Sequence, residues 1–157
     1  MPNIVLTRID NRLIHGQVAV TWVNHVGANL ILVANDEVAR DPIQQSLMDM
    51  AVPAGIETRY FTIEETINKI GLASDRQKIA IIVKTPQDVL RLVEGGVPIR
   101  HVNIGNMHFS EGKKQISSTV AVDEDDIQTF RALHEKGVKL EIRRVPHERG
   151  VDIMELI

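Results

Sequence analysis

The chain has 157 residues, of which 43% are hydrophobic, so it is long enough for one domain with a substantial core and too short for two ordinary domains. Its formal net charge of -3 excludes a chain-wide electrostatic attraction to nucleic acid or to an anionic membrane surface. It contains 0 cysteines, which excludes disulfides, thiolate metal sites and cysteine nucleophiles. We therefore expect residues 1–157 to form a single domain.

The apolar stretches of the sequence are short. The longest ones, such as Leu30 to Ala34 and Ile79 to Val83, are far shorter than the roughly 20 residues that a membrane-spanning helix needs. The segment from Met1 to Leu6 lacks the basic region, the apolar stretch and the cleavage site of a secretory signal. The sequence thus predicts a soluble protein with a cytoplasmic location.

Apolar, β-branched runs alternate with segments of helical period at a repeat of roughly 20 to 30 residues, which is typical of successive βα units. This pattern predicts an α/β fold: a single open, twisted, mainly parallel sheet of about seven strands, with helices on both faces and room for an antiparallel edge strand. The predicted strands are Asn3 to Ile9, Asn29 to Asn35, Glu57 to Thr62, Lys78 to Lys84, His101 to Ile104, Thr119 to Val122 and Lys139 to Val145.

Capping residues and prolines mark the helix starts. Asp41 and Thr85 each precede a proline, and Asp123 precedes a run of acidic residues. Thr62 and Glu65 have the spacing of a capping box. We expect one helix after Thr62, a short one within Val151 to Ile157, and others over Gln17 to His25, Pro42 to Ala51, Pro86 to Glu94 and Glu124 to Lys136.

Polar residues gather just after the predicted strands. Ligands of open parallel sheets bind outside the carboxyl ends of the strands, so these segments are the place to look for a functional site. The segments are Asp10 to Gly16, Asn35 to Glu37, Thr85 to Pro86 and Gly105 to Gly112.

His15 is the residue of this region best suited to chemistry. It is predicted near a helix N-terminus, where free backbone N–H groups and the helix dipole favour an anion. An ordinary imidazole is largely neutral at pH 7, and its ring nitrogen can attack phosphorus directly. Arg12 can pair with phosphoryl oxygens, Asp10 can orient Arg12 or the ring, and Gly16 leaves room for a partner protein. The residue types alone therefore predict an anion or phosphoryl site.

Other interpretations of this loop remain open at this point. A histidine near a helix start is commonly a surface or capping residue. Arg8 and Arg12 could form ordinary surface ion pairs, and we favour that interpretation for Arg8, at the end of the strand. The alternative function is a non-catalytic regulatory module that binds an anion or another small ligand with the same loops.

Three further residues are candidate neighbours of the site. Asp36 and Thr85 follow strands, and either could hydrogen-bond the His15 loop or a phosphoryl group, although a helix cap explains Thr85 better. His108 is a candidate second histidine, although isolated loop histidines are usually solvated. The remaining histidines form no metal-ligand pattern and no glycine-rich nucleotide motif is present, so we expect no metal and no bound cofactor.

The segment Arg8 to Val18, RIDNRLIHGQV, resembles the active-site segment of the IIB proteins of the mannose, fructose, sorbose and N-acetylgalactosamine phosphotransferase systems. Within that family, Val102 to Lys114 most resembles the members for N-acetylgalactosamine or galactosamine. The resemblance also includes Trp22, Val33 to Val38, Asp41 to Gln45, Lys84 to Pro86 and Asn103 to His108.

This resemblance implies a phosphocarrier and sugar phosphotransferase. In the family, the histidine that matches His15 accepts a phosphoryl group on Nδ1 from a IIA protein and passes it to the 6-hydroxyl of a sugar held by the membrane subunits IIC and IID. Arg12 and loop amides support the group, and Asn11 stands where an acidic residue is frequent, which affects loop tuning and partner choice. We expect IIA to be a separate polypeptide and membrane association to occur through partner subunits alone. A specificity for mannose, fructose or sorbose stays open.

Overall fold

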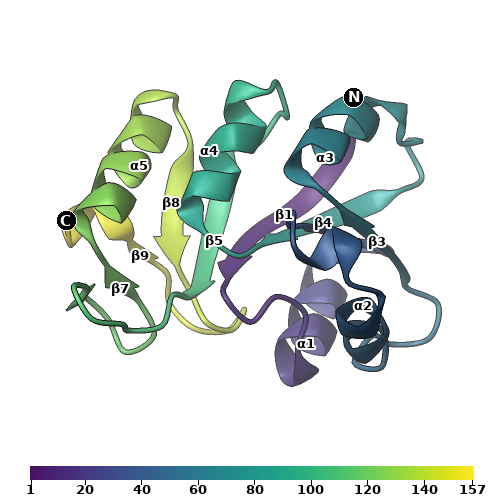
Figure 1. Ribbon diagram of the computed structural model, residues 1–157, viewed down its shortest axis with the longest axis horizontal. Helices are drawn as coiled ribbons and strands as arrows, with labels where there is room; N and C mark the ends of the chain where they lie inside the picture. Colours follow the sequence, from purple (N-terminus) through teal and green to yellow (C-terminus); the bar gives the residue numbers. More distant parts are fainter.

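The computed structural model describes residues 1–157, apart from the side chains of Gln17 and Val18. Its centre is a 7-stranded sheet of the predicted α/β kind (Figure 1). The strands are β1 (Asn3–Asp10), β2 (Leu30–Ala34), β3 (Glu57–Phe61), β4 (Lys78–Val83), β5 (His101–Asn106), β8 (Lys139–Ile142) and β9 (Val151–Asp152). They lie in the order β3-β2-β4-β1-β5-β8-β9, and neighbouring strands run parallel except for the antiparallel pair β8 and β9.

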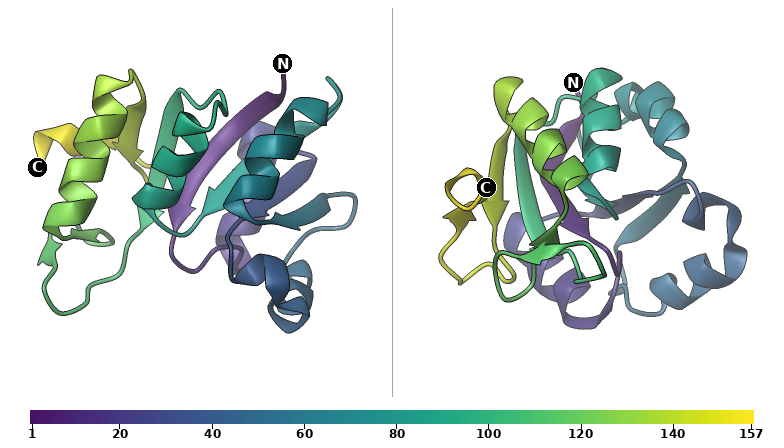
Figure 2. Two further views of the ribbon diagram at one scale, coloured as in Figure 1. Left: turned by 45° about the horizontal axis from the view of Figure 1, so that its top comes forward. Right: turned by 60° about the vertical axis from the view of Figure 1, so that its left-hand side comes forward.

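Helices cover both faces of this sheet, as Figures 1 and 2 show. On one face lie α1 (Gly16–Val26) and α2 (Pro42–Asp49). On the other face lie α3 (Ile63–Lys69), α4 (Pro86–Glu94) and α5 (Glu124–Glu135). The connections also contain the 3-10 turns η1 (Val38–Arg40), η2 (Ile70–Leu72) and η3 (Ile153–Glu155).

The two faces bury separate hydrophobic clusters. Side chains alternate along a strand, so Leu6 of β1 joins the cluster under α1 and α2, while Ile9 joins the cluster under α3, α4 and α5. Trp22 anchors the first cluster and Phe130 the second, at 5% and 0% exposure. The sheet is therefore buried on both sides, as the continuous apolar runs of its strands predict.

The predicted helix starts are confirmed by their capping hydrogen bonds. The Asp41 side chain accepts from the backbone N–H of Gln44, and the Thr85 side chain accepts from that of Asp88. Full capping boxes open α3, with Thr62 and Glu65, and α5, with Asp123 and Asp126.

One prediction in the C-terminal half needs correction. The segment Thr119 to Val122 contributes no strand to the main sheet, because β7 (Ala121–Val122) pairs antiparallel with β6 (Lys114–Gln115) in a separate 2-stranded sheet. The segment Val151 to Ile157 contains a short helix as predicted, the 3-10 turn η3, but β9 precedes it. Strands of 2 residues carry no periodicity, so their pairing depends on the partner strand that they meet.

The connections create a switch point beside β1. The chain leaves β1 toward α1 on one face, whereas it leaves the neighbouring strands β4 and β5 toward helices on the opposite face. The loops after these strands therefore separate and leave accessible space at their carboxyl ends, where ligands of such sheets bind.

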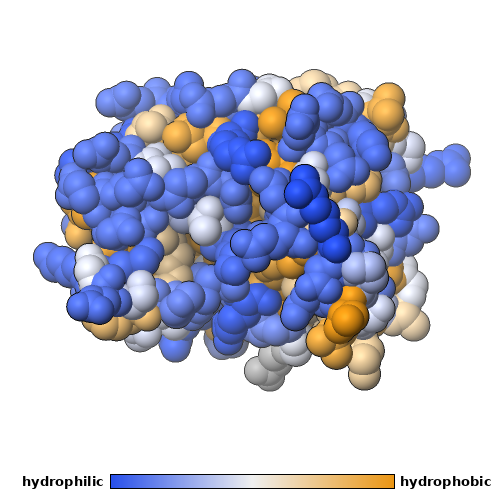
Figure 3. Space-filling view, in the orientation of Figure 1, coloured by the Kyte–Doolittle hydropathy of each residue, from blue (hydrophilic) through white to orange (hydrophobic). Residues whose placement is uncertain are grey.

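The most apolar part of the visible surface lies over α2. Figure 3 shows hydrophobic side chains gathered there, and Ile43, Leu47 and Met50 are 75%, 56% and 83% exposed. None of the helices in the described part of the chain combines the length and the apolarity needed to cross a membrane.

Candidate functional site

The loop after β1 makes a tight turn before α1 begins. The Leu13 N–H donates to the Asp10 carbonyl at 2.9 Å, and the Asn11 N–H donates to the Asn106 carbonyl at 3.1 Å. Leu13 has a φ of 60°, in the left-handed region that bulky residues rarely adopt, and its side chain is buried. Burial of Leu13 thus holds the turn in a strained form that brings His15 to the start of the helix.

His15 is the N-cap residue of α1, in an extended conformation, and its side chain is 27% exposed. Its Nε2 lies 3.2 Å from Oδ2 of Asp10. A carboxylate only accepts hydrogen bonds, so this contact favours the tautomer with hydrogen on Nε2 and a lone pair on Nδ1. No residue that the structure describes in full hydrogen-bonds Nδ1 of His15, which leaves this atom available to a reactant.

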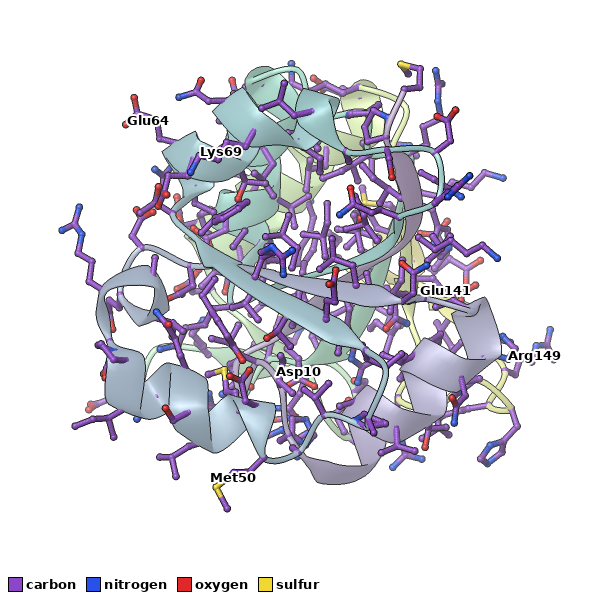
Figure 4. The ribbon with its side chains drawn as sticks, turned by 90° about the vertical axis from the view of Figure 1, so that its right-hand side faces the viewer. Asp10, Met50, Glu64, Lys69, Glu141 and Arg149 are labelled. Atoms are coloured by element: carbon purple, nitrogen blue, oxygen red, sulfur yellow. The ribbon has the colours of Figure 1, made fainter. Side chains whose placement is uncertain are left out.

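Asp10 is the centre of the hydrogen-bond network around His15. Its carboxylate is fully buried, and Figure 4 shows it inside the protein, in contrast to the outward-pointing Met50 and Arg149. Besides the His15 ring, it accepts from the backbone N–H of Arg12 at 3.0 Å and from Nε of Arg12 at 3.2 Å. The predicted role of Asp10 in orienting Arg12 or the ring is matched by contacts to both.

Arg12 reaches the surface beside His15. Its side chain is 52% exposed, while Asp10 holds its Nε end. A guanidinium carries five N–H donors in a fork, so the exposed part can still bind the oxygens of an anion. The site therefore presents a fixed cation next to the ring and near the positive end of α1.

Arg8 is buried, so the interpretation of Arg8 as part of a surface ion pair is wrong. Its side chain is 1% exposed, and Nη2 lies 3.3 Å from Oδ2 of Asp10, the oxygen that also contacts His15. Burial lowers the pKa of Arg8 below its ordinary value, against the opposing effect of Asp10. The burial of Arg8 does not follow from the residues next to it, because its partners lie far away along the chain.

Asn11 connects the loop after β1 to the loop after β5. Its side-chain oxygen accepts from Nδ2 of Asn106, and its Nδ2 contacts Nδ1 of His108. His108 is exposed and joins the site through Asn11, without a hydrogen bond to His15. Asn11 and His108 also line a cavity of about 120 Å³ with Lys84, Thr85, Pro86, Met107, Ser110, Lys113 and Asp126.

Of the remaining predicted residues, Gly16 and Thr85 lie in or beside the site, and Asp36 lies outside it. Gly16 begins α1 and is exposed, with no atom close to where a Cβ would be, so a reactant can approach there. Thr85 lies in the cavity near Asn11, but its hydroxyl caps α4, as expected. Asp36 does not reach the His15 loop, because it accepts from the Ile63 N–H at 2.9 Å and from Arg91 at 3.1 Å. These bonds hold the pKa of Asp36 below its ordinary value.

The residues behind Asp10 were not predicted as part of the site. They are Arg8 itself, Asn103 and Arg143, whose oxygens accept from Arg8, and Trp22, which lies against the guanidinium at 5.3 Å. One signal was present, because Arg8 and Asp10 are two apart on a strand and so share a face. The other partners lie too far away in the sequence to be recognised.

The arrangement suits transfer of an anionic group to nitrogen. A ring nitrogen with a lone pair, an exposed guanidinium and a helix N-terminus lie together above a buried carboxylate. Within the described residues, no three His, Cys, Asp or Glu side chains are grouped to hold a metal ion.

The chain is similar to known proteins of one family. Residues 4–157 match the family described as the PTS system sorbose subfamily IIB component. The chain is 55% identical over 157 residues to the N-acetylgalactosamine-specific phosphotransferase enzyme IIB component 2 of Escherichia coli, with 100% of both chains covered. It is 40% identical to the mannose-specific EIIAB component of the same organism, covering 98% of this chain and 48% of that one. The crystal structure of the E. coli N-acetylgalactosamine-specific IIB component 1 matches with a TM-score of 0.94 and 55% identity, over 96% of this chain and 99% of that one.

Proposed function

Because the chain belongs to the sorbose subfamily of phosphotransferase system IIB components, we propose that it carries a phosphoryl group on His15 between a IIA protein and a sugar. The observation that carries this proposal is the contact between Nε2 of His15 and the buried Asp10 carboxylate. It directs the Nδ1 lone pair outward at the N-terminus of α1, where a phosphoryl group is favoured.

In the first step, the Nδ1 lone pair of His15 attacks the phosphorus of the phosphohistidine on IIA. A new P–N bond forms, the donor P–N bond breaks, and its electron pair returns to the donor ring. The His15 ring then bears phosphorus on Nδ1 and hydrogen on Nε2, so it gains positive charge that faces Asp10. Arg12 binds the phosphoryl oxygens from the exposed side.

In the second step, the 6-hydroxyl oxygen of the sugar attacks the phosphorus and releases its proton to solvent water. The P–Nδ1 bond breaks, and its electron pair returns to His15, which regenerates the neutral ring. The sugar is held by the membrane subunits IIC and IID, so their docking must leave His15 accessible. The exposed Gly16, with open space around its Cα, supports such an approach.

N-acetylgalactosamine is the sugar that the relatives favour. The full-length relative with that specificity shares 55% of its residues with this chain, against 40% for the mannose-specific relative. We expect this chain to support uptake of labelled N-acetylgalactosamine with the IIA, IIC and IID proteins of an N-acetylgalactosamine system faster than it supports uptake of labelled mannose with those of a mannose system. Faster uptake with the mannose system would contradict the assignment.

Transfer from purified phospho-IIA tests the carrier function. We expect the parent chain to gain phosphate that is labile in acid and stable in base, as a phosphohistidine is, and His15→Ala to gain none. His134→Ala is the matched control, because that exposed ring lies near the C-terminal end of α5, outside the loop after β1, and its loss should leave phosphorylation intact. A His15→Ala chain that accepts phosphate as readily as the parent would exclude the proposal.

The same experiment separates the alternative of a non-catalytic anion-binding module. Such a module would bind inorganic phosphate reversibly at the α1 N-terminus without gaining covalent phosphate from IIA. The tautomer set by Asp10 favours the carrier, since reversible anion binding has no need of a ring lone pair directed outward.

A further inference from the structure

Arg8 is a buried cation behind the site, and the phosphotransfer steps above do not use it. Its side chain is 1% exposed at the end of β1. A buried guanidinium loses its hydration, so it persists only where the surrounding groups compensate for that loss. The groups that surround Arg8 therefore show what it does.

The groups around Arg8 come from three parts of the fold. Nη1 donates to the side-chain oxygen of Asn103 on β5 and, at 3.1 Å, to the carbonyl of Arg143 after β8. Trp22 of α1 packs against the guanidinium at 5.3 Å. Gly105, also on β5, has no side chain, and a Cβ there would lie 2.0 Å from Nη2 of Arg8. Strand β5, helix α1 and the segment after β8 thus fix the position of one guanidinium.

The Nη2 end of this fixed group points at the reactive region, while the buried Nε has no hydrogen-bond partner among the described residues. Nη2 lies 3.3 Å from Oδ2 of Asp10, and the same oxygen lies 3.2 Å from Nε2 of His15. Arg12, the other cation on Asp10, is half exposed and must be free to bind phosphoryl oxygens. Arg8 is therefore the fully buried cation on Asp10, whereas Arg12 is half exposed and also faces the position of the transferred group.

We propose that Arg8 is a positioning residue that keeps the Asp10 carboxylate aimed at Nε2 of His15, and so holds the nucleophilic Nδ1 free of hydrogen. This inference rests on the proposed function, because it concerns the nucleophile of that transfer. Without Arg8, the buried carboxylate loses its inner hydrogen-bond donor, so it is no longer fixed from behind and its hold on the Nε2 hydrogen weakens.

The test combines Arg8→Met with a measurement that does not depend on transfer. The ¹⁵N chemical shifts of the His15 ring in the unphosphorylated protein report which nitrogen carries hydrogen. We expect the Nε2–H tautomer in the parent and a mixture of both tautomers in folded Arg8→Met. The initial rate of phosphoryl transfer from IIA should fall about tenfold or more, the size found when a residue that orients an imidazole from behind is removed.

Ile104→Val is the matched control, since Ile104 is fully buried on β5 but faces the other core cluster. It should leave both the tautomer and the transfer rate unchanged. A folded Arg8→Met chain with the parental tautomer and rate would overturn the proposal and leave Arg8 a purely structural residue. An Ile104→Val chain that shifts the tautomer as much as Arg8→Met would overturn it too.

If Arg8→Met does not fold, Gly105→Ala tests the same contact. The added methyl group must displace Nη2 of Arg8, but the arginine and its positive charge are retained. A shifted His15 tautomer in Gly105→Ala supports the proposal, and an unchanged one contradicts it. A parent chain that accepts no phosphate would refute the proposed function, whereas the ring tautomers would still decide whether Arg8 orients His15.

Discussion

Asp10 combines two contacts, because one carboxylate holds both the His15 ring and the guanidinium of Arg12. It contacts Nε2 of His15 at 3.2 Å and Nε of Arg12 at 3.2 Å. A single buried group therefore sets the distance between the ring and the guanidinium. Such coupling makes the site compact enough to fit in one loop between β1 and α1.

Replacement of Arg12 by lysine should distinguish the effect of the positive charge from the effect of the planar guanidinium fork. Lysine keeps the positive charge but loses the planar fork that binds Asp10 and a phosphoryl group together. We expect the rate of phosphoryl transfer to fall about tenfold, while the free energy of unfolding changes by less than about 0.5 kcal/mol. Rapid-quench transfer assays and urea titrations measure the two quantities.

Arg144→Lys is the control for this change. Arg144 is 53% exposed, against 52% for Arg12, and pairs with Glu148 away from His15. It should leave the transfer rate unchanged. Equal transfer rates in Arg12→Lys and the parent would reduce Arg12 to a surface residue.

At the residue scale, the sequence predicted contacts between residues that are close together in the chain. His15, Asp10 and Arg12 lie within one loop, so their proximity follows from spacing. Asp36 was misplaced because its partner Arg91 is 55 positions away and draws its carboxylate toward α4. The burial of Arg8 depends in the same way on side chains of β5 and α1.

At the scale of elements, the predictable parts are those with a local chemical cause. Side-chain caps and first-turn prolines gave the starts of α2 and α4, since these groups satisfy free backbone N–H groups wherever the helix lies. The strands β6, β7 and β9 have 2 residues each, and no local pattern decides which partner they meet. β9 thus provides the antiparallel edge that the sequence left unassigned.

The N-terminus of α5 should make the free energy of unfolding decrease at low pH, because it contains the buried Asp126. Asp126 is buried and accepts from Nζ of Lys113 at 2.8 Å, from Gln87 at 2.9 Å and from the backbone N–H of Asp123 at 3.1 Å. Burial favours a higher pKa, but these hydrogen bonds outweigh it and hold the pKa of Asp126 below its ordinary value.

A lowered folded-state pKa means that the ionised carboxylate stabilises the fold. This stabilisation is complete above the unfolded-state value of about 3.9 and is lost as the pH falls through the lower folded-state value. We expect Asp126→Asn to reduce the free energy of unfolding by about 1–2 kcal/mol at pH 7. The difference from the parent should shrink as the pH falls below the ordinary carboxyl range.

Urea titrations across this pH range measure the effect, with Glu124→Gln as the control. Glu124 is an exposed acidic residue of the same first turn. Its replacement removes a charge near the helix dipole but no buried hydrogen bond, so the loss should be smaller. A difference between Asp126→Asn and the parent that stays constant down to pH 2 would contradict the assigned pKa direction.

At the scale of the whole molecule, one sheet supports two cores, and this sharing should make unfolding cooperative. Leu6 and Ile9 both lie on β1 but belong to different clusters. Loss of the strand would therefore open both layers at once. We propose on this basis that residues 1–157 unfold as a single domain, as the length and composition of the chain predict.

The single tryptophan provides a probe of one layer. Trp22 is 5% exposed, lies on the buried face of α1 and donates from Nε1 to the Arg144 carbonyl at 2.9 Å. Its fluorescence reports the cluster under α1 and α2, whereas far-ultraviolet circular dichroism also reports α3, α4 and α5 on the opposite face. We expect both signals to give the same urea midpoint and the same slope, because both layers depend on the shared strands. A fluorescence transition at clearly lower urea would show instead that the α1 and α2 layer, with the His15 loop attached to it, opens independently of the rest.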